Sequence, residues 1–170
     1  LKRLEGKEPE EIEKNTGICF DRGRQKFYLN SMGTSIEIQY PDFSVRPALD
    51  EWHHLLVLHY LDLADGTELS GRLMTFGELP DGMVRGGGFD RHTEQEISEK
   101  IGHCSPKSVK DACAVLGGRL CMSNADICAV FDFFPRYPVT FKLWFADEEI
   151  PGSGRLFLDR SAEHFLSVED

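Results

Sequence analysis

The sequence predicts an α+β protein, a mostly antiparallel twisted sheet of about six to eight strands with three or four packed helices, one of them central and buried. Short runs of alternating apolar and polar residues, joined by turn-forming residues, indicate the strands. A long apolar stretch in the middle of the chain indicates the central helix. We expect one domain, residues 1–170, trimmed at both ends from a longer protein because the chain begins at Leu1.

The first forty residues predict a short helix followed by a meander of strands. Residues 9–15 begin with a proline and end before Gly17, which is typical of an acidic helix. Residues 18–20, 27–29 and 35–40 have strand patterns, and residues 30–33 carry a hairpin turn signal between the second and third strand.

The central helix is predicted over residues 50–63, with Asp50 as its cap. At helical spacing an apolar stripe with one histidine runs along one side, and most of the opposite side is apolar as well. The helix is therefore expected to be buried on nearly all sides. The stripe consists of Trp52, Leu55, Leu56, His59 and Leu63.

The middle of the chain predicts a strand over residues 72–79, a glycine-rich loop and an αα-hairpin over residues 93–101 and 105–116. Three consecutive glycines, Gly86, Gly87 and Gly88, give the backbone great freedom. They are interpreted as a mobile loop that covers a pocket.

The last third predicts two interior strands, residues 127–134 and 139–145, because both faces of each are mostly apolar. A further strand follows over residues 155–158. Ser161 is expected to cap a final helix that the end of the chain interrupts.

The net charge of -10 disfavours nucleic-acid and membrane partners, because both bind clustered Lys and Arg. The five cysteines contain no closely spaced pair, so they are interpreted as reduced core residues of a cytoplasmic protein, and an iron-sulfur cluster is not expected. The alternative is a metal site built from Cys104, Cys121, Cys128 and His103.

His59 is the first candidate for a functional residue, because an ionisable group in an apolar stripe needs a partner. Burial would favour its neutral imidazole, which suits a metal, an axial position on a haem-like or corrinoid-like cofactor, or a general base. The alternative is a packed histidine that bonds to the main chain. The cofactor-binding set predicted with it is Tyr60, Trp52, Gly87 and Phe89.

His164 is the second candidate, because carboxylates precede and follow it in the sequence. Those carboxylates would favour its charged form, so two histidines in opposite environments would suit acid and base roles. The predicted catalytic set is His164, Asp159 and Glu169. The alternative is a surface histidine in an acidic neighbourhood, and His53 and His54 are expected to face solvent.

An ordered set of motifs runs along the chain: WHHLLVLHY at 52–60, ADGT at 64–67, TFGELP at 75–80, KLW at 142–144, DEEIP at 147–151 and LFLDRSAEHFLSVED at 156–170. With these motifs the chain resembles domain of unknown function 3786, a family with no established activity. The resemblance covers nearly all of the chain.

The resemblance implies a protein of anaerobic bacteria or archaea, since the family occurs there. Some members resemble fusions to a four-cysteine iron-sulfur segment like that of corrinoid iron-sulfur proteins, a segment that this chain lacks. Phe165 stands where the family is expected to have Tyr. The positions that match family motif residues are His59, Tyr60, Asp159, Ser161, His164, Glu169 and Asp170.

The leading hypothesis is a binding or accessory module of anaerobic metabolism that holds a small molecule or a planar, corrinoid- or haem-like cofactor. Its pocket is expected between the central helix, the glycine loop and the C-terminal segment, and an iron-sulfur or corrinoid protein is a candidate partner. The alternatives are a metal-assisted hydrolase or transferase that uses His164, and a protein-interaction domain with an acidic face.

Overall fold

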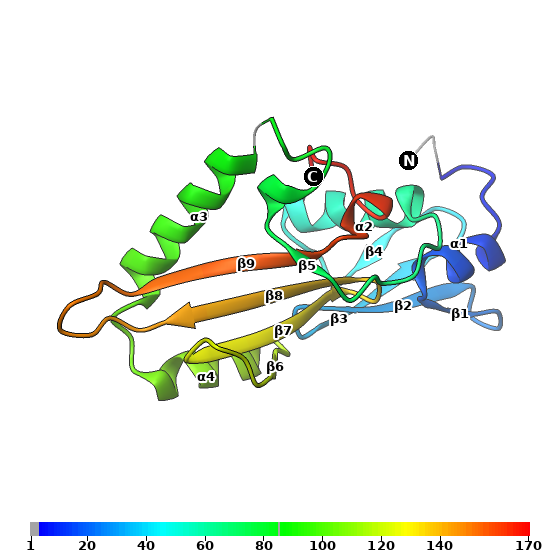
Figure 1. Ribbon diagram of the computed structural model, residues 1–170. Coiled ribbons are helices and arrows are strands. Elements are labelled where there is room, and N and C mark those ends of the chain that lie inside the picture. The colour runs from blue at the N-terminus through cyan, green and yellow to red at the C-terminus, as the bar shows by residue number, and fades with distance from the viewer. Residues whose placement is uncertain (1–3, 85) are drawn as a thin grey trace.

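A computed structural model describes residues 4–84 and 86–170 of the chain. Residues 1–3, on which the expectation of a trimmed N-terminus depends, lie outside this range. The described part contains four α-helices and two antiparallel sheets of four and five strands, so the predicted α+β class is confirmed (Figure 1). The prediction of a single sheet is wrong, because the strands within residues 19–46 pair only with one another, as do the strands within residues 73–159.

The N-terminal half begins with α1 (Pro9–Thr16) and continues with β1 (Cys19–Asp21), β2 (Lys26–Ser31), β3 (Thr34–Gln39) and β4 (Val45–Arg46). These strands pair in chain order, which confirms the predicted meander. The turn between β2 and β3 contains Met32 and Gly33, both with positive φ. Gly33 adopts φ 76° without the steric penalty of a side chain, and so it favours this tight turn.

Helix α2 (Glu51–Leu63) begins at Asp50, whose side chain accepts hydrogen bonds from the backbone N–H groups of Trp52 and His53. The predicted cap is therefore confirmed. The predicted burial on nearly all sides is wrong, since Trp52 is 76% exposed and the fully buried face consists of Val57, Tyr60 and Leu61. Apolar residues surround this helix, so spacing alone did not identify the face that packs.

After α2 the chain contains β5 (Leu73–Met74), β6 (Arg119–Leu120), β7 (Ile127–Phe134), β8 (Tyr137–Trp144) and β9 (Ser153–Asp159). They form a sheet in the order β5-β9-β8-β7-β6. The three long strands were predicted, whereas the predicted strand over residues 72–79 shortens to β5 and is followed by the 3₁₀ helix η1 (Phe76–Glu78).

Helix α3 (Gly86–Ile101) includes the three glycines, so the prediction of a mobile glycine loop is wrong. Two contacts hold this first turn against η1. A Cβ atom on Gly86 would lie 2.4 Å from the Cα atom of Gly77, so only glycine permits the approach. The carboxylate of Asp90 accepts hydrogen bonds from the backbone N–H groups of Phe76 and Gly77 at 3.2 and 2.9 Å.

Helix α4 (Pro106–Val115) follows, capped by Ser105 as predicted. It and α3 pack on the same face of the second sheet, where Ile97 of α3 and Val109 of α4 share a buried cluster with Phe131 and Phe141. After β9 the chain forms only the 3₁₀ helix η2 (Ala162–His164), and the side chain of Ser161 does not cap it. The predicted C-terminal α-helix is therefore wrong.

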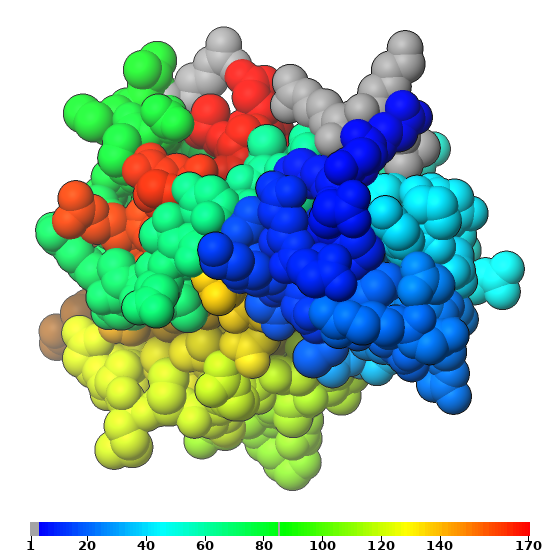
Figure 2. Space-filling view, turned by 90° about the vertical axis from the view of Figure 1, so that its right-hand side faces the viewer, coloured from blue at the N-terminus to red at the C-terminus, as the bar shows by residue number. Residues whose placement is uncertain are grey.

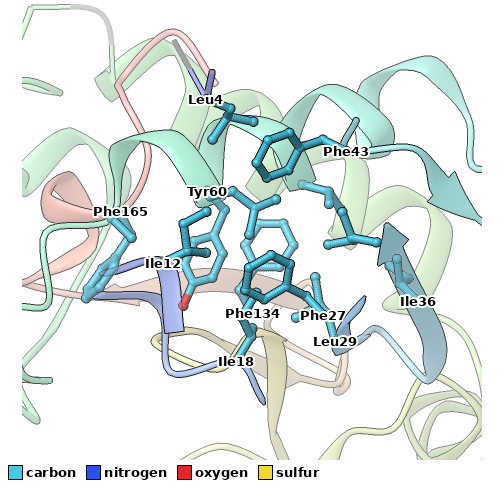
Figure 3. Close-up of a cluster of buried hydrophobic side chains, with 14 of the residues drawn as sticks. Leu4, Ile12, Ile18, Phe27, Leu29, Ile36, Phe43, Tyr60, Phe134 and Phe165 are labelled. Atoms are coloured by element: carbon cyan, nitrogen blue, oxygen red, sulfur yellow. The ribbon is translucent and has the colours of Figure 1, made fainter. Parts of the chain in front are cut away.

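The C-terminal segment, residues 160–170, lies beside α2 (Figure 1) and reaches the surface next to segments from the middle of the chain (Figure 2). Its buried Phe165 and Leu166 join the larger hydrophobic cluster, which lies between the first sheet, α1 and α2. Figure 3 shows Tyr60 and Phe134 within this cluster. Their rings stack with centroids 4.4 Å apart, so β7 of the second sheet is anchored in the core of the first half.

Candidate ligand-binding cleft

A cleft of about 860 Å³ lies between α3, the C-terminal segment and the helix-covered face of the second sheet. Figure 1 shows α3 and the C-terminal segment on the same side of β9. The cleft occupies the place where the sequence predicts a pocket, between the central helix, the glycine-containing segment and the chain end. Leu56 is the residue that α2 contributes to its wall.

The floor of the cleft is apolar and comes from the alternating pattern of the long strands. Val139 of β8 pairs with Leu158 of β9, and Leu156 is the next residue of β9 on the same face. Phe133 of β7 and Leu166 of the C-terminal segment complete this floor. Each of these side chains is at least partly buried, so packing restricts its rotamers and the apolar floor is preformed.

An aromatic pair forms the wall next to α3. The rings of Phe76 and Phe89 lie with centroids 4.9 Å apart, and Phe89 is 51% exposed. Because Asp90 fixes the backbone of η1 to the first turn of α3, both rings are held in place by the fold. Such rings offer flat, apolar surfaces against which a planar molecule can stack.

The rim of the cleft carries charges of both signs. Arg155 lies 3.4 Å from the carboxylate of Glu94, so its charge is partly satisfied within the protein. Within residues 4–84 and 86–170, Arg91 and Glu169 have no ion-pair partner, although both line the cleft and are exposed. These two side chains remain available to a ligand.

Tyr137 places a hydroxyl group at the cleft beside the chain end. Burial, together with the negative charge of Asp170, raises the pKa of Tyr137 to about 12, so the phenol stays protonated at neutral pH. The hydroxyl has no hydrogen-bond partner in the described part of the chain. A neutral donor at an apolar surface suits an acceptor atom of a bound molecule.

His59 is not buried, contrary to the prediction, because it lies on the exposed side of α2 with 41% of its side chain accessible. Its Nδ1 contacts the carboxylate of Asp170, whose side chain is nearly fully covered. Burial would raise the pKa of Asp170, but hydrogen bonds from Ser167 and His59 outweigh it and lower the value. The ring does not line the cleft.

His164 forms a second pair of the same kind, with its Nδ1 2.8 Å from the carboxylate of Asp65. Asp65 follows α2, and its pKa is lowered to about 2 because hydrogen bonds from Thr67 and His164 outweigh the opposing effect of burial. In the first pair the histidine belongs to α2 and the aspartate, Asp170, to the C-terminal segment. In the second pair the histidine belongs to the C-terminal segment and the aspartate, Asp65, follows α2. Both pairs fasten the C-terminal segment to this helix, and His164 does not line the cleft either.

Asp159 is buried and accepts five hydrogen bonds. The donors are the backbone N–H and the hydroxyl of Ser70, the N–H of Gly71, and the N–H and hydroxyl of Ser161, at 2.7–2.9 Å. Burial opposes ionisation, but these bonds outweigh it and lower the pKa of Asp159 to about 2. The carboxylate links the 65–72 loop to the end of β9, and within residues 4–84 and 86–170 no hydrogen bond joins it to His164.

Tyr60 is fully buried, and its hydroxyl donates to the carbonyl of Thr16 at 2.6 Å and accepts from the N–H of Arg136 at 3.1 Å. Burial raises its pKa far above the usual value. The side chain therefore joins α1 to the β7–β8 turn inside the core (Figure 3), and it does not line the cleft.

Of the remaining predicted residues, Phe89 and Glu169 line the cleft, whereas Trp52 and Gly87 do not. His53 is half-buried, contrary to the prediction, because it stacks on Phe133 and its Nε2 lies 2.9 Å from the hydroxyl of Ser31. Arg91 and Tyr137 were not predicted. Neither belongs to a local sequence motif, and only tertiary packing determines that they line the cleft.

Among the described residues, no three His, Cys, Asp or Glu side chains lie close enough together to hold a metal ion. The alternative site of Cys104, Cys121, Cys128 and His103 is thus not assembled, and only Cys121 and Cys128 contact each other. No helix in the same part of the chain is long and apolar enough to cross a membrane.

Residues 8–170 match a family model described as "Domain of unknown function (DUF3786)". No curated protein and no solved structure matches the chain.

Proposed function

The chain belongs to the family of domains of unknown function DUF3786, and we propose that it is a binding module for a planar or aromatic small molecule held in the cleft between α3 and the C-terminal segment. The observation that carries this proposal is the combination of the paired rings of the exposed Phe89 and the half-buried Phe76 with polar groups that have no partner within the described residues. Such a combination is typical of ligand sites.

The size and chemistry of the cleft restrict the ligand. A cleft of about 860 Å³ accommodates an aromatic ring system with substituents. Phe76 and Phe89 favour stacking, Tyr137 favours an acceptor atom, and Arg91 favours an anionic group at the rim. The ligand is therefore a flat, largely apolar molecule with an acidic substituent.

A haem-like or corrinoid-like cofactor fits the described residues less well. Such cofactors take an axial ligand from His, Cys, Met or, less often, Tyr. Of these residue types only Tyr137 is among the described residues that line the cleft, and its raised pKa keeps the phenol protonated, which disfavours metal ligation. His59, the predicted axial ligand, contacts Asp170 and does not line the cleft. An organic ligand held by stacking and hydrogen bonds is the version that the geometry supports. An iron-sulfur or corrinoid protein partner and a cytoplasmic location stay predictions.

No contact favours the hydrolase or transferase alternative. The imidazole of His164 is paired with Asp65, and the carboxylate of Asp159 is saturated by donors of the protein itself. A general base needs a free lone pair directed at a substrate, and neither group offers one beside the cleft.

Ligand-observed NMR with a panel of planar aromatic acids, and absorbance titration with haem and a corrinoid, would test the proposal. We expect binding of aromatic acids to weaken by about tenfold in Phe89→Ala, because one stacking face is lost. Trp52→Ala is the matched control, since this aromatic ring is also exposed and lies outside the cleft. Equal losses in both variants, or no binding to any member of the panel, would contradict the proposal.

A further inference from the structure

We propose that Cys121 and Cys128 form a redox-active dithiol, which reacts with low-molecular-weight disulfides to give an intramolecular disulfide between β6 and β7. The two Sγ atoms lie 3.0 Å apart. A disulfide bond needs a sulfur separation of about 2.05 Å, so an approach of roughly 1 Å completes the bond. This site lies apart from the cleft and does not depend on the proposed ligand.

The strand register places the two residues opposite each other. Arg119 pairs with Val130 and Leu120 pairs with Ala129, and the next pair along the ladder is Cys121 and Cys128. The N–H of Cys121 donates to the carbonyl of Cys128 at 2.9 Å, which holds the two residues side by side. Cα atoms of residues opposite each other in an antiparallel ladder are about 4.5 to 5.5 Å apart, a separation that a disulfide bond spans.

The two thiols differ in access, and this difference sets the order of reaction. Cys121 is exposed beside the fully exposed Met122, whereas Cys128 is 5% exposed. A small disulfide therefore reaches Cys121 first. The thiolate of Cys121 attacks one sulfur of the disulfide RSSR, and the first RS⁻ leaves.

The thiolate of Cys128 then attacks the sulfur of Cys121 in the mixed disulfide and expels the second RS⁻. The protein loses two protons and two electrons, and the small disulfide is reduced to two thiols. No other reactant is needed.

Neighbouring groups shift the pKa of Cys121 in both directions. The thiol of Cys128, together with burial, raises the pKa of Cys121, while Lys142 and Arg119 lower it. Lys142 lies on the adjacent strand β8, directly opposite Cys128. Because thiolate is the attacking species, the rate should rise with pH above neutrality.

The disulfide would fasten the edge of the second sheet. Strand β6 contains only two residues, and the loop after it is held to the end of β8 by the indole N–H of Trp144, which donates to the carbonyl of Asn124. A covalent link at Cys121 would fix the position of β6 and of this loop on β7.

Incubation of the protein with oxidised glutathione, followed by alkylation of free thiols and peptide mass spectrometry, tests the inference. We expect wild type to lose two alkylatable thiols together and to yield a peptide pair linked through Cys121 and Cys128. Cys128→Ser should stop at the mixed disulfide on Cys121, which should reach a level at least about tenfold above that of wild type. Cys104→Ser, at another exposed cysteine, is the matched control and should behave as wild type.

Cys121→Ser, a change at an exposed position, should abolish both products at this site even if a substitution at the buried Cys128 disturbs folding. Circular dichroism of each variant separates the two effects. Equal uptake of glutathione at Cys121 and Cys104 without a linked peptide, or equal mixed disulfide in wild type and Cys128→Ser, would overturn the inference.

Discussion

Replacement of Asp159 by Asn distinguishes a structural carboxylate from a catalytic one. The substitution removes the charge and directs an NH₂ group at donors that now bind the carboxylate. The lowered pKa of about 2, compared with the usual 3.8, corresponds to roughly 2 kcal/mol of stability at neutral pH. Since Asp159 is 5% exposed, the solvent screens this contribution little. We expect Asp159→Asn to lower the free energy of unfolding by roughly 2–3 kcal/mol.

The pH dependence of this loss follows from the sign of the shift. A carboxylate whose pKa is lowered by folding stabilises the folded state fully above its unfolded pKa of 3.8, and this contribution disappears as pH falls through the folded value of about 2. The difference between wild type and Asp159→Asn should thus be constant above about pH 5 and fall to roughly half by pH 3.

Urea denaturation followed by circular dichroism between pH 7 and pH 3 measures this difference. Asp132→Asn is the matched control, because Asp132 is exposed and forms a surface ion pair with Arg119. Its effect should stay within about 0.5 kcal/mol. A variant Asp159→Asn as stable as wild type at pH 7, or a difference that does not shrink toward pH 3, would refute the structural role.

Three further predictions concern the core and the C-terminal segment. Tyr60→Phe should lower the free energy of unfolding by about 2 kcal/mol in thermal or urea denaturation, because the buried carbonyl of Thr16 and the partly buried N–H of Arg136 both lose the hydroxyl. An unchanged stability would argue against the bridge from Thr16 to Arg136. Phe134→Ala should cost about 4 kcal/mol, since the ring is fully buried against Tyr60, and a loss below about 1 kcal/mol would contradict that packing. His59→Ala and His164→Ala should each speed hydrogen exchange in residues 165–170 more than elsewhere. Because the pKa values of Asp170 and Asp65 are lowered, the wild-type protein should show the same faster exchange only as pH falls below about 4.

The strands were the most predictable part of the fold. Alternation of apolar and polar residues identified β3, apolar residues on both faces identified β7 and β8, and serine and proline signals identified the start of α4. A single sequence does not specify which strands pair, so the division into two sheets was not predictable. The face of α2 that packs was also hidden, because apolar residues such as Leu55 occur all around the helix.

The errors at α3 and at the chain end have tertiary causes. Glycines disfavour helix, yet Gly86 is helical because it packs on Gly77 and Asp90 binds the neighbouring backbone. The C-terminal segment extends along α2 because Phe165 and Leu166 are buried there. None of these contacts can be read from local sequence.

The candidate site was predictable in position but mostly not in its residues. Phe89, predicted to bind a cofactor, and Glu169, predicted to be catalytic, both line the cleft, whereas its floor from β8 and β9 was not predicted. His59 and His164 were predicted as functional residues because an imidazole can bind metals and transfer protons. In the structure each is paired with an aspartate, and both pairs join the C-terminal segment to α2 or to the residues that follow it. Arg91 and Tyr137 became candidates only when the structure revealed groups without a partner among the described residues.

A crystallographic fragment screen with small aromatic acids tests the central claim most directly, because it reports where molecules of this class bind without any assumption about activity. We predict that bound fragments stack on Phe89 and place their carboxylates within hydrogen-bond distance of Arg91 or the Tyr137 hydroxyl. Fragments that gather elsewhere, for example around the exposed Trp52, and leave the cleft filled with ordered water alone would contradict the account.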